Sequence, residues 1–246
     1  SVPMLGNPSG LRNIQTPKFM TKFGILSKFD VLQTIPSIII SKINPAIFHN
    51  IGKYLAIKKA FYLSSIEGIE GDYFEFGVFT GSSFCHAIRC AKANEKYDER
   101  LGSMHFFGYD SFEGFGELQE SDEHRFYTDL NFTTNYEKVC VRVKRVADES
   151  RFTLNKGYFE QTLKKNHPSK SRIIFIDSDT NSSATLALSY LKQSLQEGTI
   201  IILDDYFSYK GSRDKGVAGA VQMFCKQEKI DFIQIASYGM GGVIMI

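Results

Sequence analysis

Apolar residues follow two rhythms along most of the chain. Short apolar runs, typical of strands buried on both faces, alternate with segments whose apolar residues are spaced i, i+3, i+4 and i+7, as on one face of a helix. The runs predict strands at 73–78 (YFEFGV), 104–110 (MHFFGYD), 151–156 (RFTLNK), 172–177 (RIIFID) and 199–205 (TIIILDD). The spacing predicts helices near 54–66, 84–91, 136–143, 184–195 and 217–225. This alternation predicts an α/β fold with a parallel sheet and helices on both faces.

The last two apolar runs break this rhythm. Residues 232–237 (FIQIAS) and 242–246 (GVIMI) are separated only by YGMG. A parallel connection needs about a dozen residues or more, so these runs are expected to form an antiparallel hairpin. Five parallel strands followed by such a hairpin are similar in chain order to the Rossmann-like sheet of class I methyltransferases.

The first 53 residues differ from the rest. Five of the six prolines lie in the first 50 residues, and no long period is visible there. We therefore expect an N-terminal arm or lid at 1–53, helical in short pieces or irregular, before a domain at 54–246. Two prolines and Lys42 interrupt the apolar segment 35–48, which favours a buried lid or a subunit contact over a membrane anchor. A homo-oligomer formed through the arm is compatible with this segment.

Composition excludes several classes of protein. The formal net charge is +2, which gives no electrostatic reason to expect a nucleic-acid partner. The basic cluster Lys164, Lys165, Lys170 and Arg172 is typical of a solvated loop. No stretch reaches the roughly 18 apolar residues of a membrane span, and no signal pattern opens the chain. Four cysteines without a C-x-x-C pair indicate reduced thiols, so a soluble cytoplasmic protein without a membrane partner is expected.

The candidate chemistry lies at strand ends, because open α/β sheets bind ligands beyond the carboxyl ends of their strands. The first strand runs into an E-x-G-x-x-x-G loop with Glu75, Gly77 and Gly81. The loop lacks the lysine of a P-loop and the G-x-G-x-x-G spacing of dinucleotide sites, whereas S-adenosylmethionine (SAM) sites tolerate it. Asp110, at the tip of the second strand, is placed to accept hydrogen bonds from the hydroxyls of a ribose. The alternatives are a simple glycine turn and an aspartate that caps a turn.

Acids also close the fourth and fifth strands. Neighbouring strand tips are expected to bring Asp177 close to Asp204 and Asp205. Three carboxylates suit Mg²⁺, which takes oxygen ligands, better than Zn²⁺. In the alternative interpretation, the Asp204–Asp205 pair caps the next segment or pairs with Arg213 or Lys215. The metal hypothesis fails if a lysine or arginine neutralises that pair in a closed pocket.

Five blocks carry a family resemblance over about residues 70–228: GDYFEFGVFTGSS, GYDSFEGF, KGYFEQTL, IDSDTNSSAT and LDDYF. In this order they resemble the macrocin O-methyltransferase family, which methylates sugar hydroxyls on natural products. The resemblance implies a Mg²⁺-assisted, SAM-dependent O-methyltransferase domain at 54–246, a small-molecule hydroxyl acceptor that is a sugar, and metal ligands at Asp177, Asp204 and Asp205. The expected cofactor-binding residues are Glu75, Gly77, Thr80, Gly81, Ser82, Ser83, Asp110, Ser111, Tyr158 and Asp177. Asn181 and Ala184 depart from the family pattern, which leaves the acceptor contacts undefined.

Methyl transfer from a sulfonium needs a hydroxyl oxygen held in line with the S–CH₃ bond. Asp177 or Asp179 is the expected catalytic carboxylate that receives the hydroxyl proton, and the resemblance favours Asp177. The five histidines are scattered, and each is expected to be structural or solvent-facing. Two alternatives stay open: a metal-independent SAM methyltransferase, and a non-catalytic module that keeps a Rossmann-like sheet as a binding platform.

Overall fold

The computed structural model describes residues 28–116, 118, 122, 124, 132–163 and 169–246. It divides into two compact units, residues up to Ile47 and residues from Phe48 onward. The first unit carries helix α2 (Asp30–Lys42), which buries none of its residues. The second unit carries every strand of the described chain.

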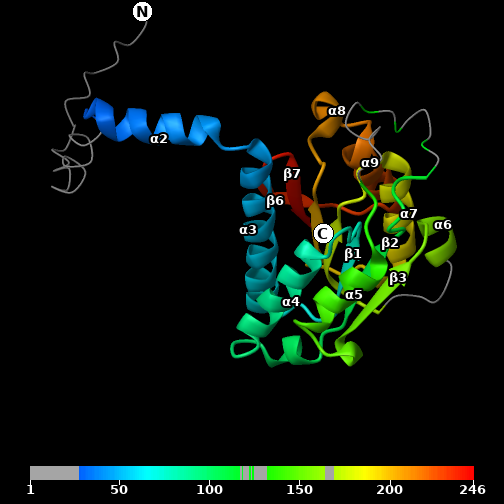
Figure 1. Ribbon diagram of the computed structural model, residues 1–246. Coiled ribbons are helices and arrows are strands. Elements are labelled where there is room, and N and C mark those ends of the chain that lie inside the picture. The colour runs from blue at the N-terminus through cyan, green and yellow to red at the C-terminus, as the bar shows by residue number, and fades with distance from the viewer. Residues whose placement is uncertain (1–27, 117, 119–121, 123, 125–131, 164–168) are drawn as a thin grey trace, which may run out of the picture. The chain divides into compact units, whose positions relative to one another are not determined.

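One seven-stranded sheet forms the centre of the second unit (Figure 1). Its strands are β1 (Asp72–Phe76), β2 (Phe106–Asp110), β3 (Phe152–Lys156), β4 (Ser171–Ile176), β5 (Ile200–Leu203), β6 (Ile233–Tyr238) and β7 (Gly241–Met245). They lie in the order β3-β2-β1-β4-β5-β7-β6. Strands β1 to β5 are parallel, and β7 pairs antiparallel with both β5 and β6. The predicted parallel strands and the C-terminal hairpin are confirmed.

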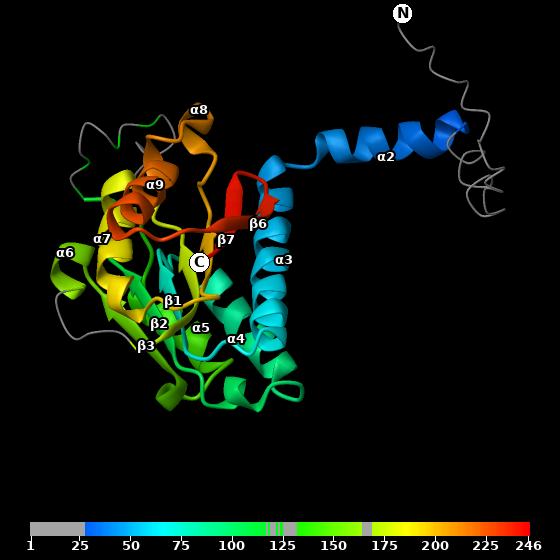
Figure 2. The same cartoon turned by 180° about the vertical axis from the view of Figure 1, so that it is seen from behind.

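Helices cover both faces of the sheet, as Figures 1 and 2 show from opposite sides. They are α3 (Pro45–Ile66), α4 (Ser82–Asn94), α5 (Tyr136–Lys144), α6 (Phe159–Thr162), α7 (Asn181–Leu191), α8 (Ser208–Gly211) and α9 (Gly216–Glu228), with 3₁₀ turns η1 (Glu99–Gly102), η4 (Glu149–Arg151) and η5 (Lys192–Ser194). Buried residues of α3, α4 and α5 pack on one face, and those of α7 and α9 pack on the other. The sheet is therefore buried between two apolar layers of helices.

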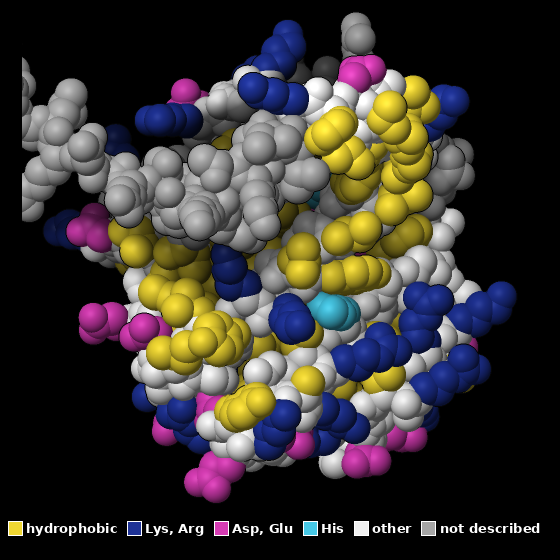
Figure 3. Space-filling view, turned by 90° about the vertical axis from the view of Figure 1, so that its left-hand side faces the viewer, with side chains coloured by type: hydrophobic (Ala, Val, Ile, Leu, Met, Phe, Trp, Pro, Cys, Tyr) yellow, Lys and Arg dark blue, Asp and Glu magenta, His cyan; other side chains and the backbone are white. Residues whose placement is uncertain are grey.

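Helix α3 begins at Pro45, nine residues before the start expected near 54. Proline is well tolerated at the first helical position, so Pro45 starts this helix and does not interrupt it. Its inner face is apolar and buried from Ala56 to Phe61. Its outer face exposes a row of apolar side chains, namely Phe48, Ile51, Leu55, Tyr62 and Ile66. Figure 3, which faces this side of the molecule, shows apolar side chains gathered among lysines and arginines.

Among the described residues, no single helix combines the length and hydropathy needed to cross a membrane. Helices α2 and α3 meet that requirement only when they are counted together as a bent pair with a break between them.

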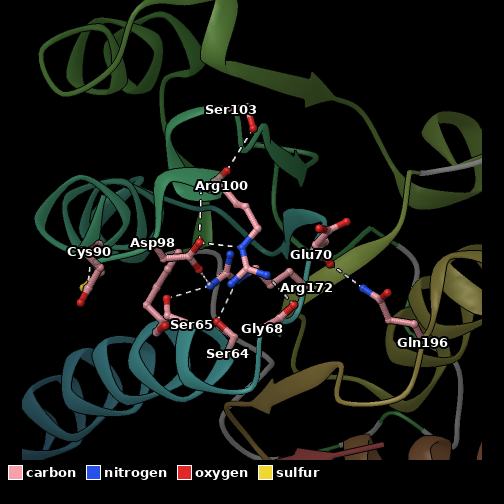
Figure 4. A network of polar contacts seen from close by, with 12 residues as sticks. Ser64, Ser65, Gly68, Glu70, Cys90, Asp98, Arg100, Ser103, Arg172 and Gln196 are labelled. Carbon is pink, nitrogen blue, oxygen red and sulfur yellow. Dashed lines mark hydrogen bonds and ion pairs between the residues drawn. The ribbon is translucent and has the colours of Figure 1, made fainter. Parts of the chain in front are cut away.

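The expectation of a solvated loop at Arg172 is wrong. Arg172 lies in β4 and is almost fully buried. Its guanidinium donates to Asp98 at 2.7 Å and to the hydroxyls of Ser64 and Ser65 at 2.9 and 2.8 Å (Figure 4). A paired and hydrogen-bonded arginine can be buried, whereas an unpaired one cannot. Lys164 and Lys165 lie outside the described residues.

Candidate active site

The loops that follow β1, β2, β4 and β5 meet at the carboxyl edge of the sheet. Backbone hydrogen bonds continue past the strands: the Asp177 N–H donates to the Phe76 carbonyl at 2.8 Å, and the Asp204 N–H donates to the Ile176 carbonyl at 3.0 Å. The acids that follow β4 and β5 therefore lie on adjacent strand ends, and the one after β4 lies beside the end of β1. This is the edge where open α/β sheets bind ligands.

The glycine loop after β1 is held tightly against the loop after β4. Gly77 has a φ of 93°, and a Cβ added there would lie 1.9 Å from the Asp177 carbonyl oxygen. Gly81 adopts a left-handed conformation directly before α4. Ser82 is exposed at the start of α4, and the Thr80 carbonyl accepts a hydrogen bond from Arg142 at 2.8 Å. The loop thus presents backbone and small side chains at the edge of the sheet.

Glu75 lies beneath this loop and is fully buried. Its carboxyl group accepts hydrogen bonds from Tyr73 Oη at 2.6 Å and from Ser83 Oγ at 2.7 Å. Burial raises the pKa of Glu75 to about 7, although both hydrogen bonds act in the opposite direction. Glu75 and Ser83 face each other, so their geometry supports the loop from below.

Asp110 fastens the loops after β1 and β2 together. One carboxylate oxygen accepts the Phe79 N–H at 2.7 Å, and the other accepts the Phe112 N–H at 2.6 Å. Both phenylalanines have positive φ, of 47° and 59°, a conformation that is unusual for a bulky residue. Burial raises the pKa of Asp110, whereas these N–H groups lower it, and the net direction is upward. The turn role considered for Asp110 is therefore present in the structure.

Two further predicted cofactor residues, Ser111 and Tyr158, lie at the same edge. Ser111 donates to the Gly114 carbonyl at 2.7 Å and accepts the Glu113 N–H at 3.1 Å, which shapes the turn after β2. Tyr158 precedes α6, and a Cβ added to Gly116 would lie 2.9 Å from its ring. The Tyr158 ring therefore packs against the segment that follows β2.

Three carboxylates converge where the loops after β4 and β5 meet. One oxygen each from Asp177, Asp179 and Asp205 lies within 4.8 Å of the others. Two oxygens bound to one Ca²⁺ are at most about 5 Å apart and two bound to one Mg²⁺ at most about 4 Å, so this spacing suits one hard cation and would close slightly around Mg²⁺. Burial raises the pKa of Asp177, and the negative charge of Asp204 raises it further, whereas Lys53 acts to lower it. Burial also raises the pKa of Asp179, as does its hydrogen bond with Asp205.

Asp204, a predicted metal ligand, has protein partners instead. Its Oδ2 lies 2.8 Å from Lys53 Nζ and 3.0 Å from His49 Nε2, and its Oδ1 accepts the Tyr238 hydroxyl at 2.7 Å. Burial acts to raise the pKa of Asp204, but the hydrogen bond from His49 and the charge of Lys53 outweigh it and hold that pKa well below its usual range. His49 therefore contacts the candidate site directly, and a purely structural role for it stays a prediction. Lys53 was not anticipated.

The alternative for the acid pair is met in a different form. Asp204 pairs with Lys53 of α3, and no ion pair to Arg213 or Lys215 occurs in the described part of the chain. The condition under which the metal hypothesis fails is therefore met for Asp204, which a largely buried lysine neutralises, but not for Asp205. Asp205 accepts a hydrogen bond from Ser208 Oγ at 3.0 Å, at the start of α8. The structure thus brings all four acids together but divides them between two sets of partners.

Asp122 is a further site residue that the sequence reasoning missed. It is fully buried, and its carboxylate accepts the N–H groups of Asn181 and Ser182 at 3.0 and 3.2 Å, together with the Ser182 hydroxyl at 2.6 Å. It therefore caps α7 directly after the Asp177–Asp179 segment. No periodic pattern surrounds Asp122, so the sequence carried no signal for it.

A signal for His49 and Lys53 did exist. The two residues lie four apart, and with Ala56, Ala60 and Phe61 they continue one inward-facing stripe of α3. A helical stripe that ends in polar residues indicates contact with buried polar groups, such as the acids at the edge of the sheet.

Comparison with known proteins agrees with this arrangement. The macrocin O-methyltransferase (TylF) family model matches residues 54–239. Among solved structures, the O-methyltransferase NovP is similar at 20% identity, with a TM-score of 0.62 and 79% of each chain covered. The calicheamicin methyltransferase CalS11 is similar at 16% identity, with a TM-score of 0.61 and 99% of each chain covered. A search of curated proteins found no match. The chain therefore belongs to the macrocin O-methyltransferase family and is an O-methyltransferase with the class I methyltransferase fold.

Proposed function

We propose that this enzyme transfers a methyl group from SAM to a sugar hydroxyl of a small molecule, assisted by Mg²⁺. The observation that carries the proposal is the meeting, at one edge of the sheet, of the glycine loop, Asp110 and the Asp177–Asp179–Asp205 group. The sugar acceptor is supported by family membership and by a CalS11 structure described as a TDP-rhamnose 3'-O-methyltransferase, with 13% identity and a TM-score of 0.53.

The proposed cofactor site runs from the β1 loop to the start of α6. Gly77, Thr80, Gly81 and Ser82 offer close backbone approach, and Glu75 and Ser83 support them from below. Asp110 and Ser111 would face the ribose, with Tyr158 beside the adenosine. Asp177 would border the cofactor site at the end of β4.

The proposed metal ligands are Asp177, Asp179 and Asp205. This set differs from the one expected from sequence, because Asp204 already accepts three polar contacts from protein groups. When bound, Mg²⁺ would supply acidification and orientation of vicinal hydroxyls. Asp177 or Asp179 would hold the hydroxyl proton, and the loops after β1 and β4 would fix the acceptor in line with the methyl group.

One observation favours the metal-independent alternative. Lys53 already places a positive charge between Asp177 and Asp204. Homo-oligomer formation and a cytoplasmic location stay predictions, supported only by the exposed apolar residues of α2 and α3 and by the free cysteines.

The test measures SAM binding by calorimetry and S-adenosylhomocysteine formation with TDP-rhamnose and related sugars, in Mg²⁺ or in EDTA. We expect micromolar SAM binding and turnover that EDTA abolishes. Asp205→Asn should bind SAM but lose turnover, while Asp214→Asn, an exposed acid nearby, should behave as wild type. No SAM binding at about 1 mM would refute the function. Turnover unchanged by EDTA would support the metal-independent mechanism.

A further inference from the structure

Lys53 is the one residue that joins helix α3 to both acid-bearing loops through ion pairs of the described chain. Its side chain is only 12% exposed, and its Nζ lies 2.9 Å from Asp177 Oδ2 and 2.8 Å from Asp204 Oδ2. The ammonium also lies 5.6 Å from the centre of the Phe175 ring. It therefore occupies the position that a cation bridging the two carboxylates would take.

Asp204 is held in place for this contact. Lys53, His49 and Tyr238 use three of the roughly four acceptor positions of its carboxylate. The Nδ1 of His49 is buried without a hydrogen-bond partner among the described residues and lies against Gly239, so its Nε2 makes the polar contact of the ring that the structure shows. Its geometry serves to orient Asp204. The carboxylate in turn fixes the Lys53 ammonium.

Among the described residues, the opposite side of the acidic group carries no such cation in an ion pair. Asp179 and Asp205 take part in no ion pair of the described residues, and Asp177 presents Oδ2 to Lys53. The fixed positive charge of Lys53 therefore lies at one end of a group of four carboxylates, beside Asp177 and Asp204. A divalent ion is repelled from that end and attracted to the other.

We propose that Lys53 is a built-in counter-cation that closes the Asp177–Asp204 pair to metal and confines a divalent ion to Asp177, Asp179 and Asp205. The inference rests on the proposed function only in that it concerns the same acidic group. Lys53 is a positioning residue, because it acts on where the divalent ion binds. The active centre then includes a residue of α3 that lies before the domain start expected at residue 54.

The test is a Mn²⁺ titration followed by the electron paramagnetic resonance signal of the free ion. Lys53→Met should bind Mn²⁺ at least about tenfold more tightly than wild type, or bind a second ion, because the pair at Asp177 and Asp204 is then open. Lys59→Met, an exposed lysine of the same helix, is the matched control and should leave Mn²⁺ affinity unchanged. A folded Lys53→Met with wild-type or weaker affinity would overturn the proposal, as would the absence of Mn²⁺ binding in both proteins.

A second variant covers the case in which Lys53→Met does not fold. Lys53→Met with Asp204→Asn removes the ion pair as a unit and keeps the net charge of the acidic group. Its Mn²⁺ affinity should stay within about threefold of wild type if Asp204 is no ligand. A loss of about tenfold or more would identify Asp204 as a ligand and overturn the proposal. SAM binding, measured in parallel, judges the proposed function separately, because the Mn²⁺ titration uses no SAM.

Discussion

Replacing Asp98 with asparagine tests how much the buried ion pair between Asp98 and Arg172 of β4 stabilises the fold. Asp98 precedes η1, and its Oδ2 accepts a hydrogen bond from Arg172 at 2.7 Å (Figure 4). The Arg172 and Asp98 side chains are only 1% and 3% exposed. Asparagine keeps the shape of Asp98 but offers one acceptor oxygen where Asp98 uses both, one for Arg100 and one for Arg172. It also removes the charge, so Arg172 stays buried without a counter-charge.

The expected loss is about 3 kcal/mol of unfolding free energy. Removing one partner of a buried pair costs about 3–5 kcal/mol, and the one hydrogen bond that the amide oxygen can still accept places the variant at the low end. The second partner, Arg100, has a side chain that is 37% exposed, so its contact adds at most about 1 kcal/mol. A 3 kcal/mol loss corresponds to a fall in Tm of about 6–12 °C for a domain of this size.

Low pH provides an independent check. Burial acts to raise the pKa of Asp98, but hydrogen bonds from Arg100 and Arg172 bring it down to about 2, below its ordinary value of 3.8. A lowered folded-state pKa contributes stability that is complete above about pH 4 and is lost as the pH falls through about 2. Wild type should lose this part of its stability on acidification, whereas Asp98→Asn should not.

The assay is urea unfolding monitored by circular dichroism. Asp148→Asn is the matched control, because Asp148 also precedes a 3₁₀ turn but its side chain makes no capping hydrogen bond. Asp98→Ala combined with Arg172→Met should be at least about 2 kcal/mol more stable than Asp98→Ala alone. A loss below about 1 kcal/mol for Asp98→Asn, with an unchanged m-value, would refute the claim that Arg172 depends on this charge.

Three further predictions concern the candidate site. Gly77→Ala should abolish SAM binding in a calorimetric titration, because the added Cβ would lie 1.9 Å from the Asp177 carbonyl oxygen. Gly102→Ala, where the added Cβ has no atom within 4 Å, is the control and should bind SAM as wild type does. Glu75→Gln should flatten the pH dependence of the unfolding free energy. In wild type the folded-state pKa of Glu75 is raised to about 7, so about 3 kcal/mol of stability present below about pH 4.5 is lost by pH 8. If urea unfolding gives both proteins the same dependence of unfolding free energy on pH, this reasoning is wrong. Asp110→Asn should weaken SAM binding at least about tenfold, because one amide oxygen cannot accept both N–H groups that Asp110 now accepts; unchanged affinity would exclude this role.

Most of the fold could be predicted because it depends on local patterns. A run such as RIIFID can be satisfied only as a buried strand or a buried helix, and its length favours the strand. The four residues between the last two runs exclude a crossover helix, so the hairpin followed from chain length alone. The positions of the acids at the sheet edge followed from the same strand assignments. Each of these inferences uses residues that are adjacent in sequence.

The partners of the buried charges could not be predicted in the same way. Arg172 pairs with Asp98 across 74 residues, and Lys53 pairs with Asp177 across 124. Long basic side chains reach across several possible neighbours, so periodicity does not select one. Arg172 was expected in solvent for this reason, although its place inside a strand already required a buried counter-charge.

The charge balance at the sheet edge connects these partners to function. Asp177, Asp179, Asp204 and Asp205 bring four carboxylates together, whereas Lys53 supplies one fixed positive charge and His49 at most one more. With all four carboxylates ionised, at least two negative charges remain in a partly buried space. Such an excess opposes folding unless protons or a cationic ligand reduce it. A divalent ion and the SAM sulfonium are both cations, so the charges that make this edge costly to fold are the ones that would favour binding the proposed ligands.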